Sequence, residues 1–219
     1  MSAGTVMVVH HETDHPPLKA HVDNVIAAHK DAGVKHYTYK PLHGPAGVSY
    51  VYMPHADEGM KASASSGAAT AGAKDMLAAS AEAAKGAVKG VGAAGMKTVA
   101  STNSGKGPAP FVLAIGVKAK AGKMGELMDA GKMIKEAHSA AESALRFSLH
   151  MADDMADTAL VLLHMDSLGE MDPDGPVSAP ILAKHLGEEE ASKVGAMLMD
   201  AIDHVWQHPM RLVPHLSAH

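Results

Sequence analysis

The sequence predicts an α+β fold built from two tandem repeats, each with the order strand–helix–strand–strand–helix–strand. In the second half, the apolar run FVLAIGV is followed by Gly122-Lys123 and then by an amphipathic helical pattern. In the first half, matching segments occur at an offset of roughly 110 residues, such as TVMVVHH for FVLAIGV and GMKTVAS for PMRLVPH. Six elements in this order form a four-stranded antiparallel sheet with two helices on one face, the ferredoxin-like arrangement.

The predicted boundary between the repeats is the segment 103–110. Gly, Ser and Pro crowd together there, without a large apolar residue to anchor the chain. The first repeat then covers residues 1–102, and the second covers residues 111–219. Within the first repeat, residues 59–100 form a distinct segment that is dominated by Ala, Gly, Ser and Lys.

The first repeat is expected to contain a strand, a helix, a hairpin, a second helix and a closing strand. Asp14 is the candidate cap of the first helix, and Gly33 suits its C-terminal end. The second helix should break near Gly86, because glycine inside a helix costs about 1 kcal/mol relative to alanine. The expected elements are Thr5–His11, the helix from Pro16 to Gly33, Val34–Lys40, Val48–Met53, the helix Lys74–Lys85 and Met96–Ser101.

The second repeat has a more regular pattern. Its third strand, Thr158–Met165, is almost continuously apolar, so both of its faces should be covered. Its last helix is expected over Glu188–Trp206, because apolar residues follow the i, i+3, i+4, i+7 pattern there. The other expected elements are the strands Phe111–Lys118, Leu145–His150 and Met210–Leu216 and the helices Gly122–Ala141 and Pro180–Leu186.

The composition narrows the class of protein. Of the 219 residues, 47% are hydrophobic, and the net charge is −5 with histidine neutral, without a basic stripe that would follow a nucleic-acid backbone. The absence of cysteine excludes disulfides and thiolate metal sites. We expect no membrane span, because no run of about 18 apolar residues occurs. The N-terminus lacks the charged region of a signal peptide, so we expect a cytoplasmic protein.

Three short segments of the second repeat carry a resemblance to a known family. Gly122-Lys123 is followed by Glu126-Leu127, HMDSLGEM ends the third strand, and ILAKHL contains His185. In these places the region Pro110–Leu216 resembles the antibiotic-biosynthesis-monooxygenase type of dimeric α+β barrel. The resemblance implies two sheets whose open faces cover each other, either within one chain or in a homo-oligomer.

The chain departs from this family at two positions. Met165 stands where the family often has a tryptophan, and Gly116 falls near the polar residue that heme-degrading members carry on the first strand. Of the three residues that such members use, His185 alone remains. Tandem members of the superfamily, such as chlorite-dismutase-like proteins, bind heme through a histidine of the second repeat, and the resemblance would give that part to His164 or His185.

Histidine is abundant, with 16 residues in the chain. This side chain binds transition metals and exchanges protons near neutral pH. The segment HHETDH, with His10, His11 and His15, could chelate a metal ion or could simply form a solvated turn. His204 and His208 lie four residues apart on the expected last helix, without the glutamate of a zinc-protease motif.

Aromatic residues are the expected substrate-binding side chains. All four tyrosines of the chain lie in the expected hairpin of the first repeat. Cross-strand packing would account for them, but they could also line a pocket and offer hydroxyl groups to a substrate. In the second repeat, Phe147 and Met165 are the expected pocket residues. The tyrosines are Tyr37, Tyr39, Tyr50 and Tyr52.

We expect a small-molecule enzyme that acts on an apolar organic substrate, either by cofactor-independent oxygenation or by isomerisation. His164 or His185 would be the general base, because a neutral imidazole accepts protons near pH 7. No cofactor is predicted, and the chain lacks the glycine spacing of nucleotide-binding motifs. The alternative is a non-catalytic, histidine-rich protein that binds heme or a transition metal.

Overall fold

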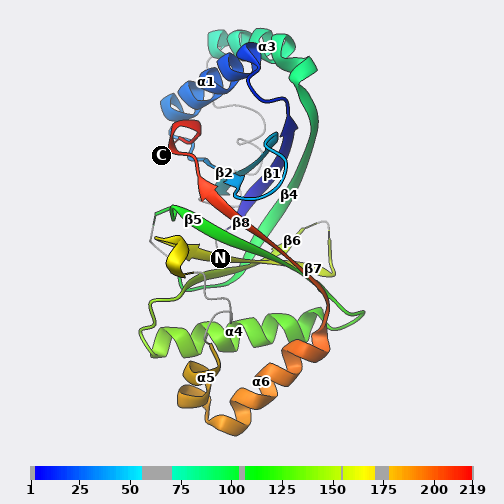
Figure 1. Ribbon diagram of the computed structural model, residues 1–219, viewed down its shortest axis with the longest axis vertical. Helices are drawn as coiled ribbons and strands as arrows, with labels where there is room; N and C mark the ends of the chain where they lie inside the picture. Colours follow the sequence, from blue (N-terminus) through cyan, green and yellow to red (C-terminus); the bar gives the residue numbers. More distant parts are fainter. Residues whose placement is uncertain (1–2, 56–70, 104–106, 154, 171–177, 219) are drawn as a thin grey trace. The chain divides into compact units, whose positions relative to one another are not determined.

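The described residues of the computed structural model form two compact units (Figure 1). The first unit contains Ser2–Met96 and Arg211–His219, and the second contains Lys97–Met210. Strands β4 (Val88–Ser101) and β8 (Ile202–Leu212) each contribute residues to both units. The structure describes residues 3–55, 71–103, 107–153, 155–170 and 178–218.

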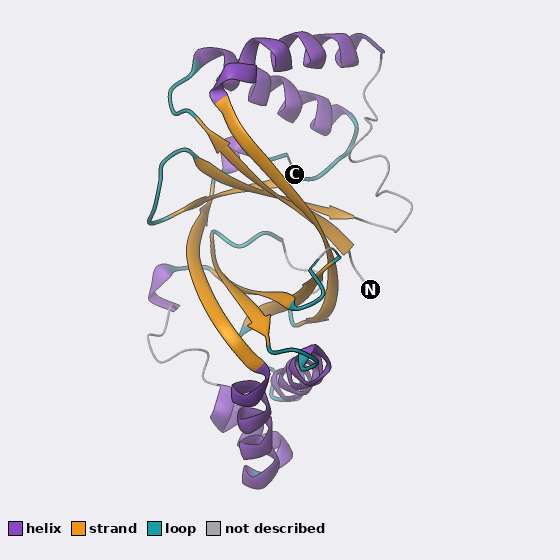
Figure 2. Cartoon of the chain, turned by 90° about the vertical axis from the view of Figure 1, so that its right-hand side faces the viewer, coloured by secondary structure: helices purple, strands orange, loops and turns teal. Residues whose placement is uncertain are grey.

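The first unit has the order β-α-β-β-α-β. Its elements before β4 are β1 (Ala3–His11), α1 (Pro16–Asp31), β2 (Tyr37–Pro41), β3 (Val48–His55), α3 (Ala71–Ala84) and the 3-10 turn Lys85–Ala87. Strand β3 lies between β1 and β2 and pairs antiparallel with both, and β4 is the other neighbour of β1. Helices α1 and α3 pack against each other (Figure 2).

Local chemistry explains the ends of helix α1. The ring of His15, rather than the expected Asp14, caps the helix, because its Nδ1 atom accepts a hydrogen bond from the Leu18 amide at 3.3 Å. Pro16 then occupies the first turn, where no amide donor is needed. After the helix, Gly33 has a φ of +66°, as expected for a glycine that ends a helix.

The glycine-rich segment differs from the expectation beyond Gly86. Helix α3 ends at Ala84 and the 3-10 turn follows, which agrees with the predicted break. Strand β4 then begins at Val88 instead of Met96 and takes in the glycines at 90, 92 and 95. These glycines disfavour a helix, whereas an extended strand tolerates them as long as its backbone is paired.

The second unit repeats the same order. Its elements are β5 (Phe111–Ala119), α4 (Met124–Ala140), β6 (Arg146–Ala152), β7 (Thr158–Met165), the 3-10 turn Leu168–Glu170, α5 (Ser178–Leu186), α6 (Glu188–Ala201) and β8. Strand β7 lies between β5 and β6 and pairs antiparallel with both. Strand β8 is the other neighbour of β5, and the end of β4 is the other neighbour of β6.

Helices α4, α5 and α6 lie on one side of this sheet (Figure 1). Leu127 of α4 packs with Leu149 of β6 and Ala159 of β7 in one buried cluster. A second cluster joins α4 to Leu182 of α5 and Val194 of α6. The sheet therefore has one face that is covered by helices of its own unit and one face that is not.

The last helix is shorter than expected. Helix α6 ends at Ala201, and Ile202 already has an extended backbone with φ −86° and ψ 126°. The predicted helix as far as Trp206 is therefore wrong, because Ile202, Val205 and Trp206 lie in strand β8. Branched and aromatic residues favour strands, and their spacing also fits one face of a helix, so the pattern alone misassigned them.

Both units contain the predicted order of elements, so an α+β fold of two tandem ferredoxin-like repeats is confirmed. The pairing within each repeat places the first strand next to the third and the fourth, as this arrangement requires. In the described part of the chain, every helix is too short or too polar to cross a membrane.

Candidate functional site

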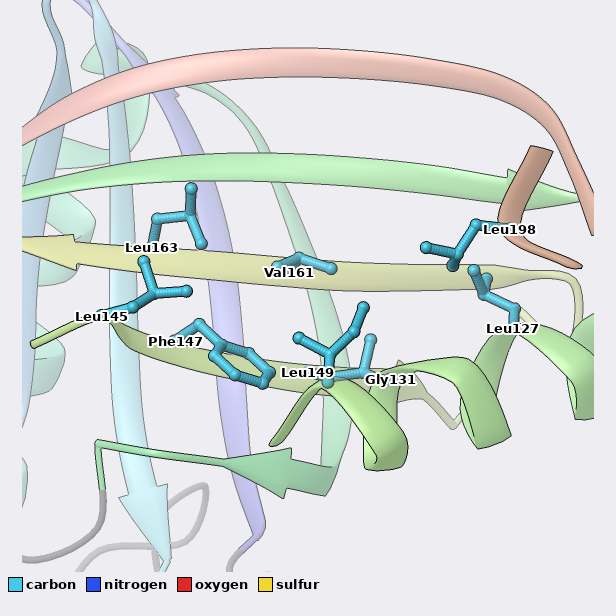
Figure 3. A pocket seen from close by; sticks show the side chains of 9 residues that line it. Leu127, Gly131, Leu145, Phe147, Leu149, Val161, Leu163 and Leu198 are labelled. Carbon is cyan, nitrogen blue, oxygen red and sulfur yellow. The ribbon is translucent and has the colours of Figure 1, made fainter. Parts of the chain in front are cut away.

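An apolar cavity of about 110 Å³ lies in the second unit, between the sheet and its helices (Figure 3). Helix α4 forms one wall, strands β6 and β7 form the opposite wall, and Leu198 of α6 closes one end. All of the side chains that line it are apolar. Among them are Leu127, Ile134, Phe147, Leu149, Val161 and Leu163.

Gly131 helps to shape this cavity. It lies in the middle of α4, where a glycine costs about 1 kcal/mol relative to alanine. A Cβ atom at this position would overlap the side chain of Leu149. The glycine therefore allows β6 and α4 to approach each other while Leu149 stays in place.

His138 is a buried polar side chain next to Phe147, one of the residues that line this cavity. It follows Ile134 by one helical turn on the same face of α4, and its side chain is only 2% exposed. Its ring approaches Phe147 edge-on, with 6.2 Å between the ring centroids. Burial lowers the pKa of His138 below 6.5, so the imidazole is neutral at pH 7.

His138 is not among the residues predicted from the sequence, although the sequence contains a signal for it. Its distance of four residues from Ile134 and seven from Gly131 puts it on the covered face of a predicted helix.

The two predicted pocket residues of this unit also face the helices. Phe147 lines the cavity, and Met165 is 5% exposed on the same face of β7, two residues beyond Leu163.

The opposite face of the sheet carries a chain of hydrogen-bonded polar side chains. The ring of His150 on β6 makes contacts of 3.1 Å from Nδ1 to Thr98 Oγ1 and 2.8 Å from Nε2 to Ser148 Oγ. Ser148 Oγ also lies 3.1 Å from Nε2 of His164 on β7. His164, one of the two predicted general bases, therefore lies at the end of the chain Thr98–His150–Ser148–His164.

The environment of His164 keeps its ring neutral. Burial lowers its pKa to about 4, and the charges of Arg146 and His150 act in the same direction. Arg146 is the cross-strand partner of His164 and makes an ion pair of 3.0 Å with Asp166. The Nδ1 atom of His164 is buried and has no hydrogen-bond partner among the residues that the structure describes.

His185, the other predicted base, lies elsewhere. It is an exposed residue of α5, and α5 packs through Leu182 against α4. Since His164 is on the sheet face that these helices do not cover, the structure does not bring the two predicted bases together. Neither of them lines the apolar cavity.

The four tyrosines form two cross-strand pairs in the first unit. Tyr37 lies opposite Tyr52, and Tyr39 lies opposite Tyr50, so all four side chains share one face of the hairpin. Burial raises the pKa of Tyr37, Tyr50 and Tyr52, which keeps their hydroxyl groups protonated. This arrangement fits the packing interpretation.

The HHETDH segment is engaged in local structure. His11 has contacts of 3.0 Å to Ser49 Oγ and 2.9 Å to the Glu12 carbonyl oxygen, and His15 caps α1. His10 is exposed. Within the described ranges, no three histidine, aspartate or glutamate side chains come together so that they could hold a metal ion.

His204 and His208 lie on strand β8 rather than on a helix, as does Trp206 between them. The rings of His204 and Trp206 stack with 6.0 Å between their centroids. A Cβ atom on Gly116 of β5 would overlap the indole ring. Gly116, where the resemblance placed a missing polar residue, thus makes room for the tryptophan.

A chain of two ferredoxin-like repeats has the dimeric α+β barrel fold, in agreement with the resemblance seen in the sequence. The chain is similar to the crystal structure of a "putative monooxygenase" from Lactobacillus acidophilus NCFM, with a TM-score of 0.63, 10% identity and coverage of 100% of this chain and 96% of that chain. It is also similar to a "putative monooxygenase" from Fusobacterium nucleatum subsp. nucleatum ATCC 25586, with a TM-score of 0.61, 9% identity and coverage of 96% of this chain and 92% of that chain.

A third similar structure is that of an anthrone oxidase-like protein, with a TM-score of 0.57, 6% identity and coverage of 97% of this chain and 91% of that chain. No protein-family model and no curated protein matches the sequence. At such low identities, the likeness to these structures shows the fold and leaves the chemistry to the residues of the chain.

Proposed function

We propose that the chain is a small-molecule enzyme that binds a compact apolar molecule in the cavity between β6, β7 and α4. The observation that carries this proposal is the purely apolar lining of the cavity. Dry apolar cavities take up apolar molecules of matching size. The volume of about 110 Å³ is below that of pockets for drug-sized ligands, about 300–1,000 Å³, so the cavity suits one small ring or the apolar end of a larger substrate.

The reaction would be a cofactor-independent oxygenation or an isomerisation. Both begin with the removal of a proton from an activated C–H or O–H group, and in the oxygenation O₂ then oxidises the resulting anion. One of the similar structures is an anthrone oxidase-like protein, which supports activated aromatic compounds as the substrate class.

His138 is the proton acceptor that the geometry favours for a molecule in this cavity. Its ring is buried against Phe147, which lines the cavity, and its lowered pKa keeps it in the accepting form. His164 lies on the other face of the sheet, and His185 is exposed on α5. General-base catalysis contributes about 10²–10⁴-fold to a rate, so His138→Gln should lower kcat by that order.

The test uses oxygen consumption and product formation with activated aromatic compounds, from phenol to anthrone, and benzene as a binding probe. Val161→Phe should fill the cavity and abolish both benzene binding and turnover. Leu162→Phe is the matched control, because the next residue of β7 faces away from the cavity. The proposal fails if wild-type protein binds no benzene, or if Val161→Phe and Leu162→Phe behave alike.

The pH profile gives a second readout for His138. Because burial lowers its pKa, the neutral base persists below pH 6.5, and kcat/KM should begin to fall only at a more acidic pH than for an ordinary histidine. A fall centred at or above pH 6.5 in the wild type would exclude His138 as the base.

A further inference from the structure

We propose that Thr98, His150, Ser148 and His164 form a proton relay, and that the Nδ1 atom of His164 is a second proton-exchange site, for the hydroxyl group of a ligand. This site lies on the sheet face opposite the apolar cavity. It uses neither the cavity nor His138, so it stands independently of the proposed function.

The relay rests on three consecutive contacts within the second unit. They join Thr98 Oγ1 to His150 Nδ1 at 3.1 Å, His150 Nε2 to Ser148 Oγ at 2.8 Å, and Ser148 Oγ to His164 Nε2 at 3.1 Å. All three lie within the usual range of hydrogen bonds. His150 is 5% exposed and Ser148 is 6% exposed, so water does not compete for the middle of the relay.

The hydrogen atoms of the relay couple the two imidazole rings. Ser148 has one hydroxyl hydrogen and faces one ring nitrogen on each side, so it donates to one ring and accepts from the other. If Ser148 donates to His164, then Nε2 of His150 carries a proton, and His164 is protonated at Nδ1. If Ser148 donates to His150, the assignments reverse. The two neutral rings therefore always hold opposite tautomers.

The Nδ1 atom of His164, at one end of the relay, is the atom that a ligand would contact. Nδ1 of His164 is buried and has no partner among the described residues, whereas buried polar atoms in native proteins are almost always paired. The charge of Arg146 acts on this ring, and Arg146 forms an ion pair with Asp166. The Arg146 side chain is only 14% exposed, and its positive charge favours an oxygen that becomes negative beside His164. A phenol-type hydroxyl group fits these requirements.

Proton transfer along the relay balances at every atom. The ligand O–H bond breaks, and its proton binds Nδ1 of His164, while Nε2 of the same ring gives its proton to Ser148 Oγ. Ser148 passes its own hydrogen to Nε2 of His150, whose Nδ1 proton moves to Thr98 Oγ1. Thr98 is half-buried, and its original hydroxyl hydrogen passes to bulk water, which takes up the proton. The ligand becomes an oxyanion, and both rings end neutral.

Nitrogen-15 NMR of the histidine rings tests the coupling directly, without a ligand. In the wild type, His150 and His164 should carry opposite tautomers. Ser148→Ala should remove this relation, whereas Ser139→Ala, at an exposed serine of α4, should preserve it. The relay is overturned if both rings carry the proton on the same nitrogen in the wild type, or if Ser148→Ala leaves both tautomers unchanged.

Phenol is the probe for the ligand site. It should shift the Nδ1 signal of His164 in the wild type and equally in Val161→Phe, in which the cavity is filled. In Ser148→Ala, the coupled response of His150 should disappear. If phenol leaves the His164 ring signals unchanged, the ligand site is refuted. If phenol acts in the wild type and not in Val161→Phe, its binding belongs to the cavity, which refutes the second site and supports the proposed function.

Discussion

Glycine positions decide how closely large side chains approach the sheet of the second unit. Gly116 lies under the ring of Trp206, and Gly131 lies against Leu149. At both positions, a side chain from another element occupies the space that a Cβ atom would take. The sequence shows these glycines, but it does not show which neighbour fills the space, because that neighbour is distant along the chain.

Gly116→Ala should destabilise the protein by about 1–3 kcal/mol, because the new methyl group must displace the rigid indole ring of Trp206. Trp206 is the single tryptophan of the chain, so its fluorescence reports the displacement as well as unfolding. Gly90→Ala is the matched control in another strand, since no atom lies within 4 Å of the added Cβ. Equal stability of the two variants in urea titrations would contradict the packing described for Gly116.

The candidate residues show how far single positions are predictable. The family resemblance and the position at the edge of the third strand predict His164 as a general base, and the structure gives it a buried Nδ1 atom without a hydrogen-bond partner among the described residues. The sequence alone does not single out His138, because its importance depends on Phe147, which comes from β6. Strand periodicity predicts which residues share a face, but only tertiary structure shows what lies on that face.

At the scale of elements, the strands β6 and β7 are predictable from the sequence, and the end of α6 is not. The period of two in a strand places Phe147 and Leu149 on the helix side and Ser148 and His150 on the other side. The change from helix to strand at Ile202 has no glycine or proline to mark it. Pairing of β8 with β5 supplies backbone partners there, and this long-range contribution overrides the local helical pattern.

The buried histidines of the paired strands β6 and β7 should make the free energy of unfolding depend on pH. Burial lowers the pKa of His150 and of His164 to about 4, whereas histidine in an unfolded chain titrates near 6.5. Between these values the unfolded chain binds protons that the folded chain does not. The stabilisation is therefore complete above pH 6.5 and is lost as the pH falls towards 4, by up to about 3 kcal/mol for each ring.

Urea titrations at pH 7 and pH 4.5 measure this effect. His164→Gln should reduce the difference in unfolding free energy between the two pH values, because one titrating ring is gone. His185→Gln, at an exposed histidine of α5, should retain the difference seen in the wild type. An unchanged pH dependence in His164→Gln would show that this ring is not kept neutral by the fold.

For the whole molecule, the order of elements was predictable because each half of the chain carries the same succession of strand and helix periodicities. The extent of each unit was not predictable, because the residues that complete a sheet are remote in sequence. The first unit includes Arg211–His219, and the second includes residues 97–102. Neither segment carries a pattern that assigns it to its unit.

Backbone hydrogen bonds show what these segments contribute. In the first unit, His36 and Ala218 exchange two bonds of 2.9 and 3.0 Å, and the Thr38 amide donates to Ser217 Oγ at 3.0 Å. In the second unit, the Thr102 amide donates to the Phe147 carbonyl oxygen at 2.9 Å, and the Phe147 amide donates to Thr102 Oγ1 at 2.9 Å. Each segment thus supplies partners to buried groups that would otherwise be unpaired.

We therefore expect that the fragments 1–102 and 111–219, produced separately, do not fold, and that they fold when mixed. Fragment 1–102 lacks the partners of His36 and Thr38, and fragment 111–219 lacks the partners of Phe147. NMR dispersion and circular dichroism of each fragment and of the mixture measure this. Cleavage of the folded, intact chain within 103–110 is the control, and its two pieces should stay associated. A dispersed spectrum from fragment 111–219 alone would show instead that the second repeat is an independent domain, because its own strands would then suffice to pair its sheet.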